Sequence, residues 1–591
     1  MKLSKLYCNK QNFKSIKFND GVNIIIGRIE NPQNKDLNVH NLGKSLIVKI
    51  IDFVLLKSKS FLNDNINIFE GYSFFLEIKL NSGKYLTIKR TVGENKILFK
   101  EHSLGNQNFI NEINWDYSDY TISSKKKNAK TLLQNYLDFN IFQNNNYRNI
   151  LTYFLRDQND YKDPFKLSKF KGSDSNWKPI LFEMLGYSGD LLENKYSLDK
   201  DIENIDLEIK RLQKNEQFQI DDLDKYQTQL ETLENEITQY NKLLKKFDYF
   251  LIEQNISDEL VNQIEERIAA LNIERYELQS DIKNINESLD DIQIYNYDEL
   301  YNLYNEIKIY FPNQLKKSYD DLIDFNNKIT SERKLKLSQL LKDKDNSIVI
   351  IDKELLQLNS QRSEMLKSLS ESNEFDKYTQ KQREILKVQG TIEKLKNKID
   401  IINKIKEKEI EKNTLIGNRD LIINKIQENI SEGTIVSKEI KKLFGEYVNK
   451  LTSLKGILSI KPLQTGNIEF NYAVMNSQGE ITQESEGHTY RKALCSCLDL
   501  ALITEYSDKS FFRFVFHDGC VDGDDGRIAI KYLELIKDLS KTKNLQCIVT
   551  MIDSVVPRKA DGTQYNISDE EVILELNDNP DNSGLLFGFK F

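Results

Sequence analysis

The chain contains 591 residues, of which 39% are hydrophobic and 29% are charged. This length predicts several domains, and the high charge content is typical of a globular part combined with long solvated helices. The formal net charge of −8 excludes a surface that is basic as a whole, so any contact with nucleic acid must come from a local patch.

The first pattern along the chain is an apolar strand, residues 22–26, that ends at a glycine. A Gly-Lys-Ser sequence follows at residues 43–45 and opens the apolar run 46–56, which we expect to be a helix. This order places backbone N–H groups and a lysine around a phosphate chain, and a hydroxyl beside its Mg²⁺ ion. The spacer is longer than in the usual phosphate loop, and the alternative is an ordinary loop that caps a helix. The predicted nucleotide-binding residues are Gly27, Asn41, Gly43, Lys44 and Ser45.

The run 46–56 is also the longest apolar stretch of the sequence. Lys49 and Asp52 interrupt it, so it cannot cross a membrane. The N-terminus lacks the apolar segment of a signal peptide. We therefore expect a cytoplasmic protein without a membrane contact.

The remainder of residues 1–190 alternates short apolar strands with polar turns and helical patterns, which indicates a mixed α/β lobe. Its most basic segment is either a solvated loop or a surface that contacts the phosphates of DNA. The candidate DNA-binding residues in this segment are Lys125, Lys126, Lys127 and Lys130.

Two long segments, residues 191–294 and 319–440, show the pattern of a coiled coil. Residues 190–389 contain no glycine, and their apolar side chains recur at spacings of three and four. Such a seam, sustained over more than four heptads, predicts helices that pair along their length. We expect one break in the first segment, near residues 256–258.

The tyrosine-rich segment 295–318 separates the two coiled-coil segments and contains Pro312, where a helix can end and the chain can turn back. Two arms of comparable length around one turn predict an antiparallel hairpin with its apex at this segment. The alternative is a parallel dimeric rod, which would leave the two terminal lobes at opposite ends.

Glycines and strand patterns return in residues 441–591. Residues 512–516 predict a buried strand that continues through His517 to Asp518, which would set a carboxylate beside nucleotide-bound Mg²⁺. The Gly-Lys-Ser sequence and this aspartate must share one site, so the hairpin has to bring the two terminal lobes together. The predicted fold class is α/β, with a split ATPase head whose halves are joined by a long antiparallel coiled-coil hairpin.

This organisation resembles the SMC- and RecN-like ABC ATPases, in which ATP is held between two heads. The sequence Ser485-Glu486-Gly487, ahead of a helical run, is similar to the family signature that meets the γ-phosphate on a second head. The alternative for Ser485 is an ordinary helix cap. Asp518 and Asp525 match the register of the family's acidic residues. The resemblance implies ATP and Mg²⁺ as cofactors, and a homodimer formed through the heads and through the apex of the arms.

Two residues of the family's hydrolytic machinery are replaced in this sequence. Gly519 stands at the position of the general-base glutamate, and Ile552 stands at that of the switch histidine. Neither residue accepts a proton, so the resemblance implies slow or absent hydrolysis. Asp522 and His517 are the nearest groups that could substitute, although His517 is equally well explained as a packed side chain. Gln158 is similar to the family's glutamine that senses magnesium and water. The expected metal site comprises Ser45, Asp518 and Gln158.

All five cysteines lie outside the predicted arms, which excludes a zinc hook of the Cys-x-x-Cys type at the apex. Their odd number and unpaired spacing favour reduced thiols.

Within the family, the sequence most resembles the compact SMC-like subunits of prokaryotic anti-phage defence systems, including the Lamassu type. The shared features are the expanded phosphate loop, the His-Asp strand and the absent glutamate. This resemblance implies an ATPase that senses or clamps double-stranded DNA, its ends or unusual structures. It further implies a separate effector, such as a nuclease, and accessory subunits from the same operon. Two alternatives remain open: a weakly hydrolysing or non-hydrolysing nucleotide-locked scaffold, and a housekeeping DNA-repair ATPase.

Overall fold

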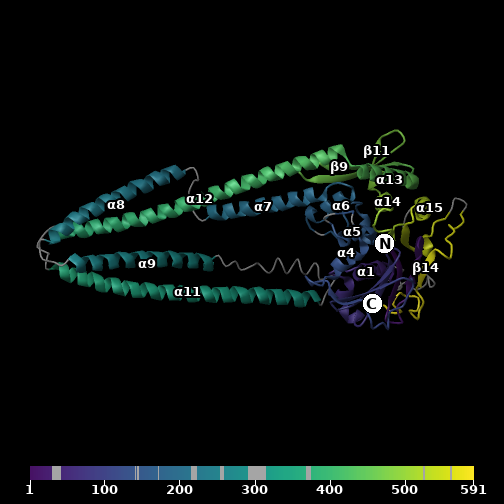
Figure 1. Cartoon of the computed structure of the whole chain (residues 1–591), viewed down its shortest axis with the longest axis horizontal. Coiled ribbons are helices and arrows are strands. Elements are labelled where there is room, and N and C mark those ends of the chain that lie inside the picture. Colours follow the sequence, from purple (N-terminus) through teal and green to yellow (C-terminus); the bar gives the residue numbers. More distant parts are fainter. Residues whose placement is uncertain are drawn as a thin grey trace. The chain divides into compact units, whose positions relative to one another are not determined.

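The computed structural model divides the chain into two compact units (Figure 1). We call Met1–Ile209 together with Lys408–Phe591 the head, and Lys210–Glu407 the arm. The structure describes residues 1–28, 42–139, 141–142, 145–170, 172–214, 222–252, 258–290, 314–367, 374–522, 526–558 and 562–590.

A five-stranded parallel sheet in the order β14-β3-β13-β12-β8 forms the centre of the head. Its strands are β3 (Val22–Arg28), β8 (Leu155–Arg156), β12 (Phe514–Asp518), β13 (Gln546–Ile552) and β14 (Val572–Asn577). The N-terminal part of the chain contributes β3 and β8 and the C-terminal part contributes β12, β13 and β14, so neither end can form this sheet alone. The interior strands are buried on both faces, which explains their nearly continuous apolar runs. The prediction of a split α/β head is confirmed.

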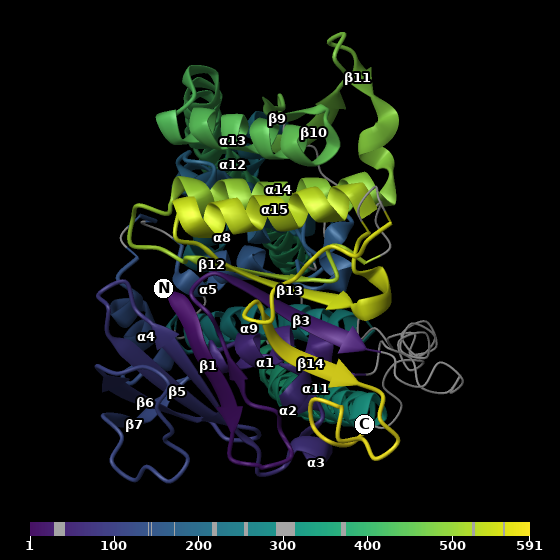
Figure 2. The same ribbon diagram turned by 90° about the vertical axis from the view of Figure 1, so that its right-hand side faces the viewer.

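Helices cover both faces of the central sheet (Figure 2). On one face lies α1 (Lys44–Val54), and on the other lie α14 (His488–Glu505) and α15 (Gly526–Thr542). Outside this second layer, α13 (Ile435–Thr452) packs on α14 and α15. The head therefore stacks helix, sheet and helix around one apolar core. The other head helices are α2 (Phe61–Asp64), α3 (Ile66–Phe69), α4 (Ala129–Leu137), α5 (Tyr147–Phe154) and α6 (Lys178–Met184).

Two antiparallel sheets complete the head. The six-stranded sheet runs in the order β2-β1-β4-β5-β6-β7 and comes entirely from the N-terminal lobe. The three-stranded sheet runs in the order β11-β10-β9 and comes from the C-terminal lobe. Their strands are β1 (Lys2–Cys8), β2 (Ile16–Lys17), β4 (Ser73–Lys79), β5 (Tyr85–Thr91), β6 (Lys96–His102), β7 (Tyr117–Thr121), β9 (Lys455–Pro462), β10 (Ile468–Met475) and β11 (Ile481–Thr482).

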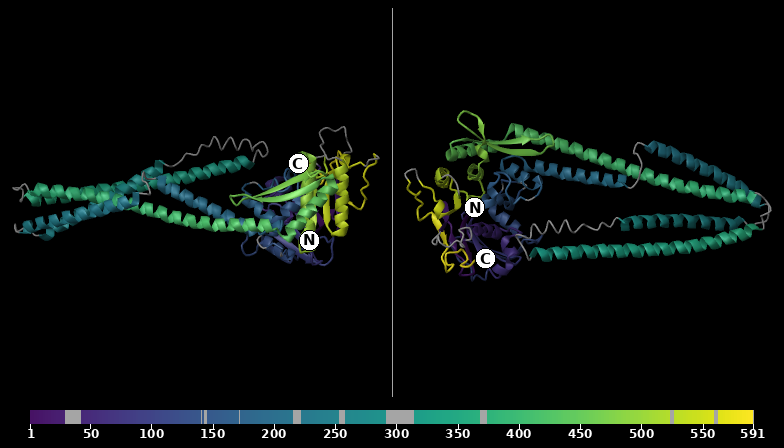
Figure 3. Two further views of the ribbon diagram at one scale, coloured as in Figure 1. Left: turned by 90° about the horizontal axis from the view of Figure 1, so that it is seen from above. Right: turned by 180° about the vertical axis from the view of Figure 1, so that it is seen from behind.

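The arm consists of long helices that pair in antiparallel fashion (Figure 3). Arg267 of α9 pairs with Glu354 of α11, and Asp281 of α9 pairs with Lys344 of α11. Residue numbers on α11 therefore decrease as those on α9 increase, so the two helices are antiparallel. In the second pair, Lys398 of α12 lies over Tyr226 of α8 and Lys381 lies over Tyr240, so these two helices are antiparallel as well. The hairpin is confirmed for the described helices, and the parallel rod is wrong. The long helices are α7 (Gly189–Lys214), α8 (Leu223–Ile252), α9 (Asp258–Asp290), α11 (Gln314–Lys367) and α12 (Glu374–Glu432).

The arm divides into two helical pairs, α8 with α12 and α9 with α11. Within the first coiled-coil segment, α8 ends at Ile252 and α9 begins at Asp258, close to the predicted break. Near this level the two pairs meet, because Gln382 Nε2 of α12 donates to Glu265 Oε2 of α9 at 2.8 Å. The predicted apex, residues 295–318, lies for its larger part outside the described residues.

A buried ion pair fixes the end of α1 and gives the head an acid-sensitive contact. Arg148 Nη2 contacts Asp52 Oδ1, and Lys57 Nζ donates to Asp52 Oδ2 at 2.7 Å. Burial by itself would raise the pKa of Asp52, but the charges of Arg148 and Lys57 outweigh burial and hold this pKa at about 2.

We therefore expect Asp52→Asn to lower the free energy of unfolding of the head by roughly 2 kcal/mol at neutral pH. The folded-state pKa lies below the ordinary carboxyl value, so this contribution is complete above about pH 4 and is lost as the pH falls toward 2. Denaturant titrations at a series of pH values measure the difference. Asp119→Asn, at an exposed pair with Lys127, is the control. A difference between wild type and Asp52→Asn that does not shrink with acid would contradict the assignment.

Candidate nucleotide site at the carboxyl edge of the central sheet

The first part of the site is the start of α1, which follows β3. Gly43 is the N-cap of α1 with φ 97°, and no side chain caps the helix. A Cβ atom at Gly43 would lie 2.7 Å from Leu586 Cβ, so both the space and the left-handed backbone require glycine. The N-cap glycine offers no side-chain acceptor to the first N–H groups of α1, and a helix start of this kind suits an anion. Gly27, in β3, lies beside the Lys44 stem.

Lys44 is buried at this helix start, with 4% of its surface exposed. Its Nζ donates to the carbonyl oxygen of Met551, in β13, at 3.3 Å. Burial lowers the pKa of Lys44, while the charges of Asp522 and Asp518 oppose that change. The lysine charge therefore sits between the helix start and two carboxylates.

Asp518 ends β12 and is fully buried. Thr550 Oγ1, on the neighbouring β13, donates to Asp518 Oδ1 at 2.5 Å, and the Ser45 hydroxyl donates to the same carboxyl group. Burial raises the pKa of Asp518, and these hydrogen bonds and the charge of Lys44 act in the opposite direction. Asp518 Oδ2 has no hydrogen-bond donor among the described residues.

This pair of oxygen ligands fits Mg²⁺. A buried carboxylate oxygen without a donor, next to a serine hydroxyl, is the donor set by which proteins hold a magnesium ion that also binds phosphates. Within the described residues there is no cluster of three or more His, Cys, Asp or Glu that could hold a metal by itself. The protein ligands thus suit a magnesium ion that arrives with a nucleotide.

The turn after Asp518 brings two further predicted residues together. Gly519 has φ 68°, and a Cβ atom there would lie 3.1 Å from Asp522 Oδ2 and 3.1 Å from Gln158 Cγ. Gln158 belongs to a short 3₁₀ helix, η2 (Gln158–Tyr161), that directly follows β8 and Asp157. Asp522 and Gln158 therefore flank Gly519, directly after the strand that ends in Asp518.

Lys492, which the sequence analysis did not identify, contacts the backbone of this turn. It lies in the first turns of α14 and is 7% exposed. Its Nζ donates to the carbonyl oxygen of Gly519 at 3.2 Å and also contacts the carbonyl oxygen of Asp522. The available sequence signal was a lysine that directly precedes the apolar run of this helix, at a position that the structure buries.

His517 is not part of the site, and the prediction that it could act as a base is wrong. Consecutive strand residues point to opposite faces, so His517 points away from Asp518. It is fully buried, with Nδ1 at 2.6 Å from Tyr532 Oη and Nε2 at 3.2 Å from Asp499 Oδ2. Both ring nitrogens are occupied, which corresponds to the packed alternative.

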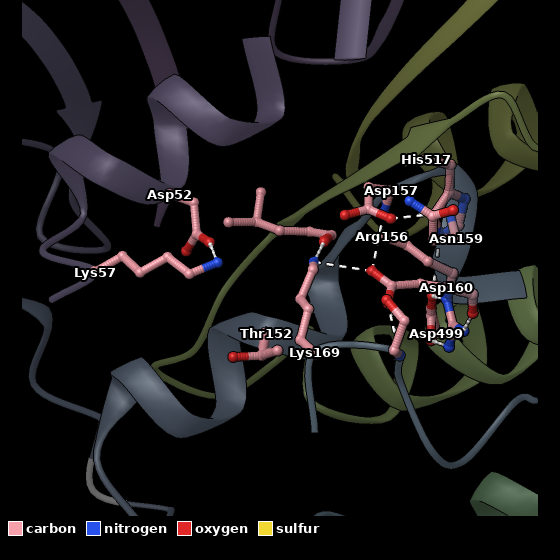
Figure 4. Close-up of polar contacts among 12 residues, drawn as sticks. Asp52, Lys57, Thr152, Arg156, Asp157, Asn159, Asp160, Lys169, Asp499 and His517 are labelled. Atoms are coloured by element: carbon pink, nitrogen blue, oxygen red, sulfur yellow. Dashed lines mark hydrogen bonds and ion pairs between the residues drawn. The ribbon is translucent and has the colours of Figure 1, made fainter. Parts of the chain in front are cut away.

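Asp499 also binds Arg156 through two parallel hydrogen bonds, from Nε at 2.6 Å and from Nη2 at 2.7 Å (Figure 4). Arg156 Nη1 donates to the carbonyl oxygen of Asp160, whose carboxylate pairs with Lys169 at 3.0 Å. This buried network ties β8 and η2 of the N-terminal lobe to α14 and β12 of the C-terminal lobe. It thereby fixes the strand ends that carry Gln158 and Asp518.

The other predicted residues lie outside the described chain, just before α14 or at the end of β13. Asn41 and Asp525 lie outside the described residues. Ser485 belongs to the 3₁₀ helix η5 (Gln483–Glu486), and Gly487, not Ser485, is the N-cap of α14. Ile552 ends β13 opposite Gly27 and places no proton acceptor there.

The predicted basic segment runs from the loop after β7 into the first turn of α4, and none of its described contacts reaches the nucleotide site. Lys127 pairs with Asp119, and Lys130 Nζ donates to Ser58 Oγ at 2.9 Å. Lys125 and Lys126 are exposed. No helix in the described part of the chain combines the length and apolar character needed to span a bilayer.

Fold and site together define a split α/β head with a phosphate-loop-like helix start, joined to an antiparallel coiled-coil arm. Residues 446–591 match the family described as "Uncharacterised protein conserved in bacteria (DUF2326)". No curated protein matches the chain.

Among solved structures, the Smc head domain with a coiled coil and joint from Pyrococcus yayanosii is 15% identical, and the match covers 96% of this chain and 98% of that chain with a TM-score of 0.35. The Smc head domain with an extended coiled coil from Pyrococcus furiosus, bound to the C-terminal domain of ScpA, is 12% identical over 94% of this chain and 90% of that chain, with a TM-score of 0.33.

Proposed function

We propose that the head binds Mg²⁺-ATP at the carboxyl edge of the central sheet and acts as an SMC-like ATPase. One observation carries this proposal. Lys44 and Ser45 meet Asp518, from the other end of the chain, and one buried oxygen of this carboxylate has no donor in the part of the chain that the structure describes. If this ion pair were only structural, we would expect that oxygen to accept a hydrogen bond from the chain itself, because a buried oxygen without a donor is costly.

Each residue then has a defined task. The N–H groups at the start of α1 and the Lys44 ammonium bind the phosphates, while Ser45 and Asp518 hold the magnesium ion. Bound magnesium neutralises charge on the phosphates during transfer. Asp522 accepts the proton of the attacking water, and Gln158 orients that water. Because an aspartate on a turn replaces a glutamate at the strand end, we expect slow hydrolysis.

The wider function proposed here is an ATP-controlled clamp or sensor for DNA in an anti-phage defence complex that restrains a separate effector. Two heads close on ATP through Ser485, Gly487 and Asp525. DNA phosphates bind at Lys125 and Lys126, whose exposure supports this role, with Lys127 and Lys130 beside them. A DNA-repair ATPase would use the same residues.

We expect Lys44→Ala to weaken ATP binding by about a hundredfold, because a buried charge-assisted contact to phosphate is lost. Titration calorimetry with Mg²⁺-ATP measures this effect on the full chain. Asp518→Asn should abolish the magnesium dependence of binding. Lys49→Ala, an exposed lysine one turn further along α1, is the control and should bind as wild type. Wild-type affinity in Lys44→Ala would refute the proposed site.

A nucleotide-locked scaffold is the second candidate, and Gly519 and Ile552 favour it because neither accepts a proton. ATP turnover with and without linear DNA separates the two functions. Turnover that requires Lys44 and rises with DNA supports the DNA-responsive ATPase. Tight binding that requires Lys44, without any turnover, supports the scaffold.

A further inference from the structure

A second polar cavity, of about 170 Å³, lies at the opposite edge of the central sheet. Asp20, Arg513 and Asn544 line it, and each comes just before a parallel strand, namely β3, β12 and β13. The amino ends of parallel strands meet at one edge, so these residues gather far from the carboxyl edge. The length of β12 separates this cavity from Asp518 by roughly 15 Å. It is therefore not part of the nucleotide site.

Cationic side chains outnumber carboxylates around the cavity. Lys2 of β1 and Lys79 of β4 join Arg513 in its lining, and Asp20 is the one carboxylate there. Asp20 Oδ2 pairs with Lys79 at 2.9 Å. The lining side chains thus carry a net charge of +2.

Lys2 is held inside this cluster by neutral groups. It is 5% exposed, and its Nζ donates to the carbonyl oxygen of Asp20 at 2.6 Å and to Asn544 Oδ1 at 2.7 Å. Burial lowers the pKa of Lys2; Asp20 opposes this change, but the charges of Lys79 and Arg513 add to it. The cations repel one another, and an anion in the cavity would relieve that repulsion.

Within the described chain, one donor of Arg513 has no acceptor, namely Nε. Its Nε is shielded from solvent and has no hydrogen-bond partner among the described residues, and none of the described carboxylates forms an ion pair with it. A buried guanidinium donor without an acceptor is costly, which indicates that the acceptor is supplied from outside the chain. The guanidinium fork fits the oxygens of a phosphate group.

We propose that this cavity is a second, separate phosphate-binding site, in which Arg513, Lys2 and Lys79 hold a phosphate monoester. The net charge of +2 on the lining side chains balances a phosphate dianion. The phosphate belongs either to a free phosphate ester or to the 5′ end of a DNA strand. The cavity opens at the edge opposite the nucleotide site, so both sites can be filled at once.

Thermal unfolding of the full chain tests this site. The measurement uses Lys44→Ala with a C-terminal purification tag, so that the nucleotide site does not contribute. Inorganic phosphate and pyrophosphate should raise the unfolding temperature above that in chloride of equal ionic strength. Arg513→Gln should abolish this rise, and Arg513→Lys should restore part of it. Lys84→Gln, an exposed lysine next to the cavity that pairs with Glu101, should retain it.

Fluorescence anisotropy then identifies the source of the phosphate. A preference of about tenfold for 5′-phosphorylated over 5′-hydroxyl duplex, lost in Arg513→Gln, assigns the site to a DNA end. Equal affinity for the two duplexes, together with stabilisation by phosphate, assigns it to a free phosphate ester. Should Arg513→Gln fail to fold, Lys79→Gln takes its place.

The proposal is overturned if neither phosphate nor pyrophosphate stabilises the protein beyond chloride, or if the Arg513 variant responds as strongly as its parent. Neither outcome bears on the proposed ATP site, because every protein in the comparison carries Lys44→Ala.

Discussion

Asp522→Asn is expected to slow ATP hydrolysis by about a hundredfold or more, with little change in ATP affinity. Asp522 Oδ2 lies 3.1 Å from the point where a Cβ on Gly519 would stand, so its carboxylate lies beside the position from which a general-base glutamate would extend. Because Asp518 is expected to hold the metal, Asp522 is the carboxylate beside Gly519 that we expect to accept a proton. Asparagine retains the shape of the side chain and removes that ability.

Single-turnover hydrolysis measures the chemical step, and calorimetry with Mg²⁺-ATP measures binding. Asp553→Asn is the matched control, because Asp553 is an exposed carboxylate that follows β13 at the same edge of the sheet. Its hydrolysis should equal that of wild type. Equal rates for Asp522→Asn and wild type would show that another group, or no protein base, activates the water.

Arg156→Met is expected to lower the free energy of unfolding of the head by about 3–5 kcal/mol. The change leaves the Asp499 carboxylate buried without its guanidinium, while His517 remains as a single partner at 3.2 Å. It also removes the donors to the carbonyl oxygens of Asp160 and Pro164. Because this network joins β8 to β12 and α14, the loss affects the contact between the two lobes.

Denaturant unfolding followed by tryptophan fluorescence reports this effect, since Trp115 and Trp177, the two tryptophans of the sequence, both lie in the head. Arg28→Met is the control. Arg28 pairs with Glu575 at 2.6 Å on the surface, with both side chains about half exposed, and such pairs contribute about 1 kcal/mol or less. The double change Arg156→Met with Asp499→Leu should recover part of the loss. Equal destabilisation by Arg28→Met and Arg156→Met would contradict a special role for the buried pair.

Much of the candidate site could be predicted because its residues come with local patterns. A strand before a Gly-Lys-Ser sequence and an apolar strand that ends in aspartate each specify a chemical group and its place at a strand end. The structure brings Lys44, Ser45 and Asp518 to one place because β3, β13 and β12 are parallel neighbours. His517 was ambiguous for the opposite reason: a histidine one residue before an aspartate looks the same in sequence whether it faces the site or the core.

The sequence by itself determined the periodic features of this protein: the heptad seam of the arm, the antiparallel return of the chain and the apolar strands of the head. These features follow from the spacing of residues along the chain and do not depend on contacts with residues far away in the sequence. Only the tertiary structure decided which side chains lack a partner. Lys492 contacts the turn of Gly519 within the C-terminal lobe. The Arg156 network and the cationic cavity of Arg513 join residues hundreds of positions apart, so their burial and the repulsion among the cations exist only once the lobes have packed.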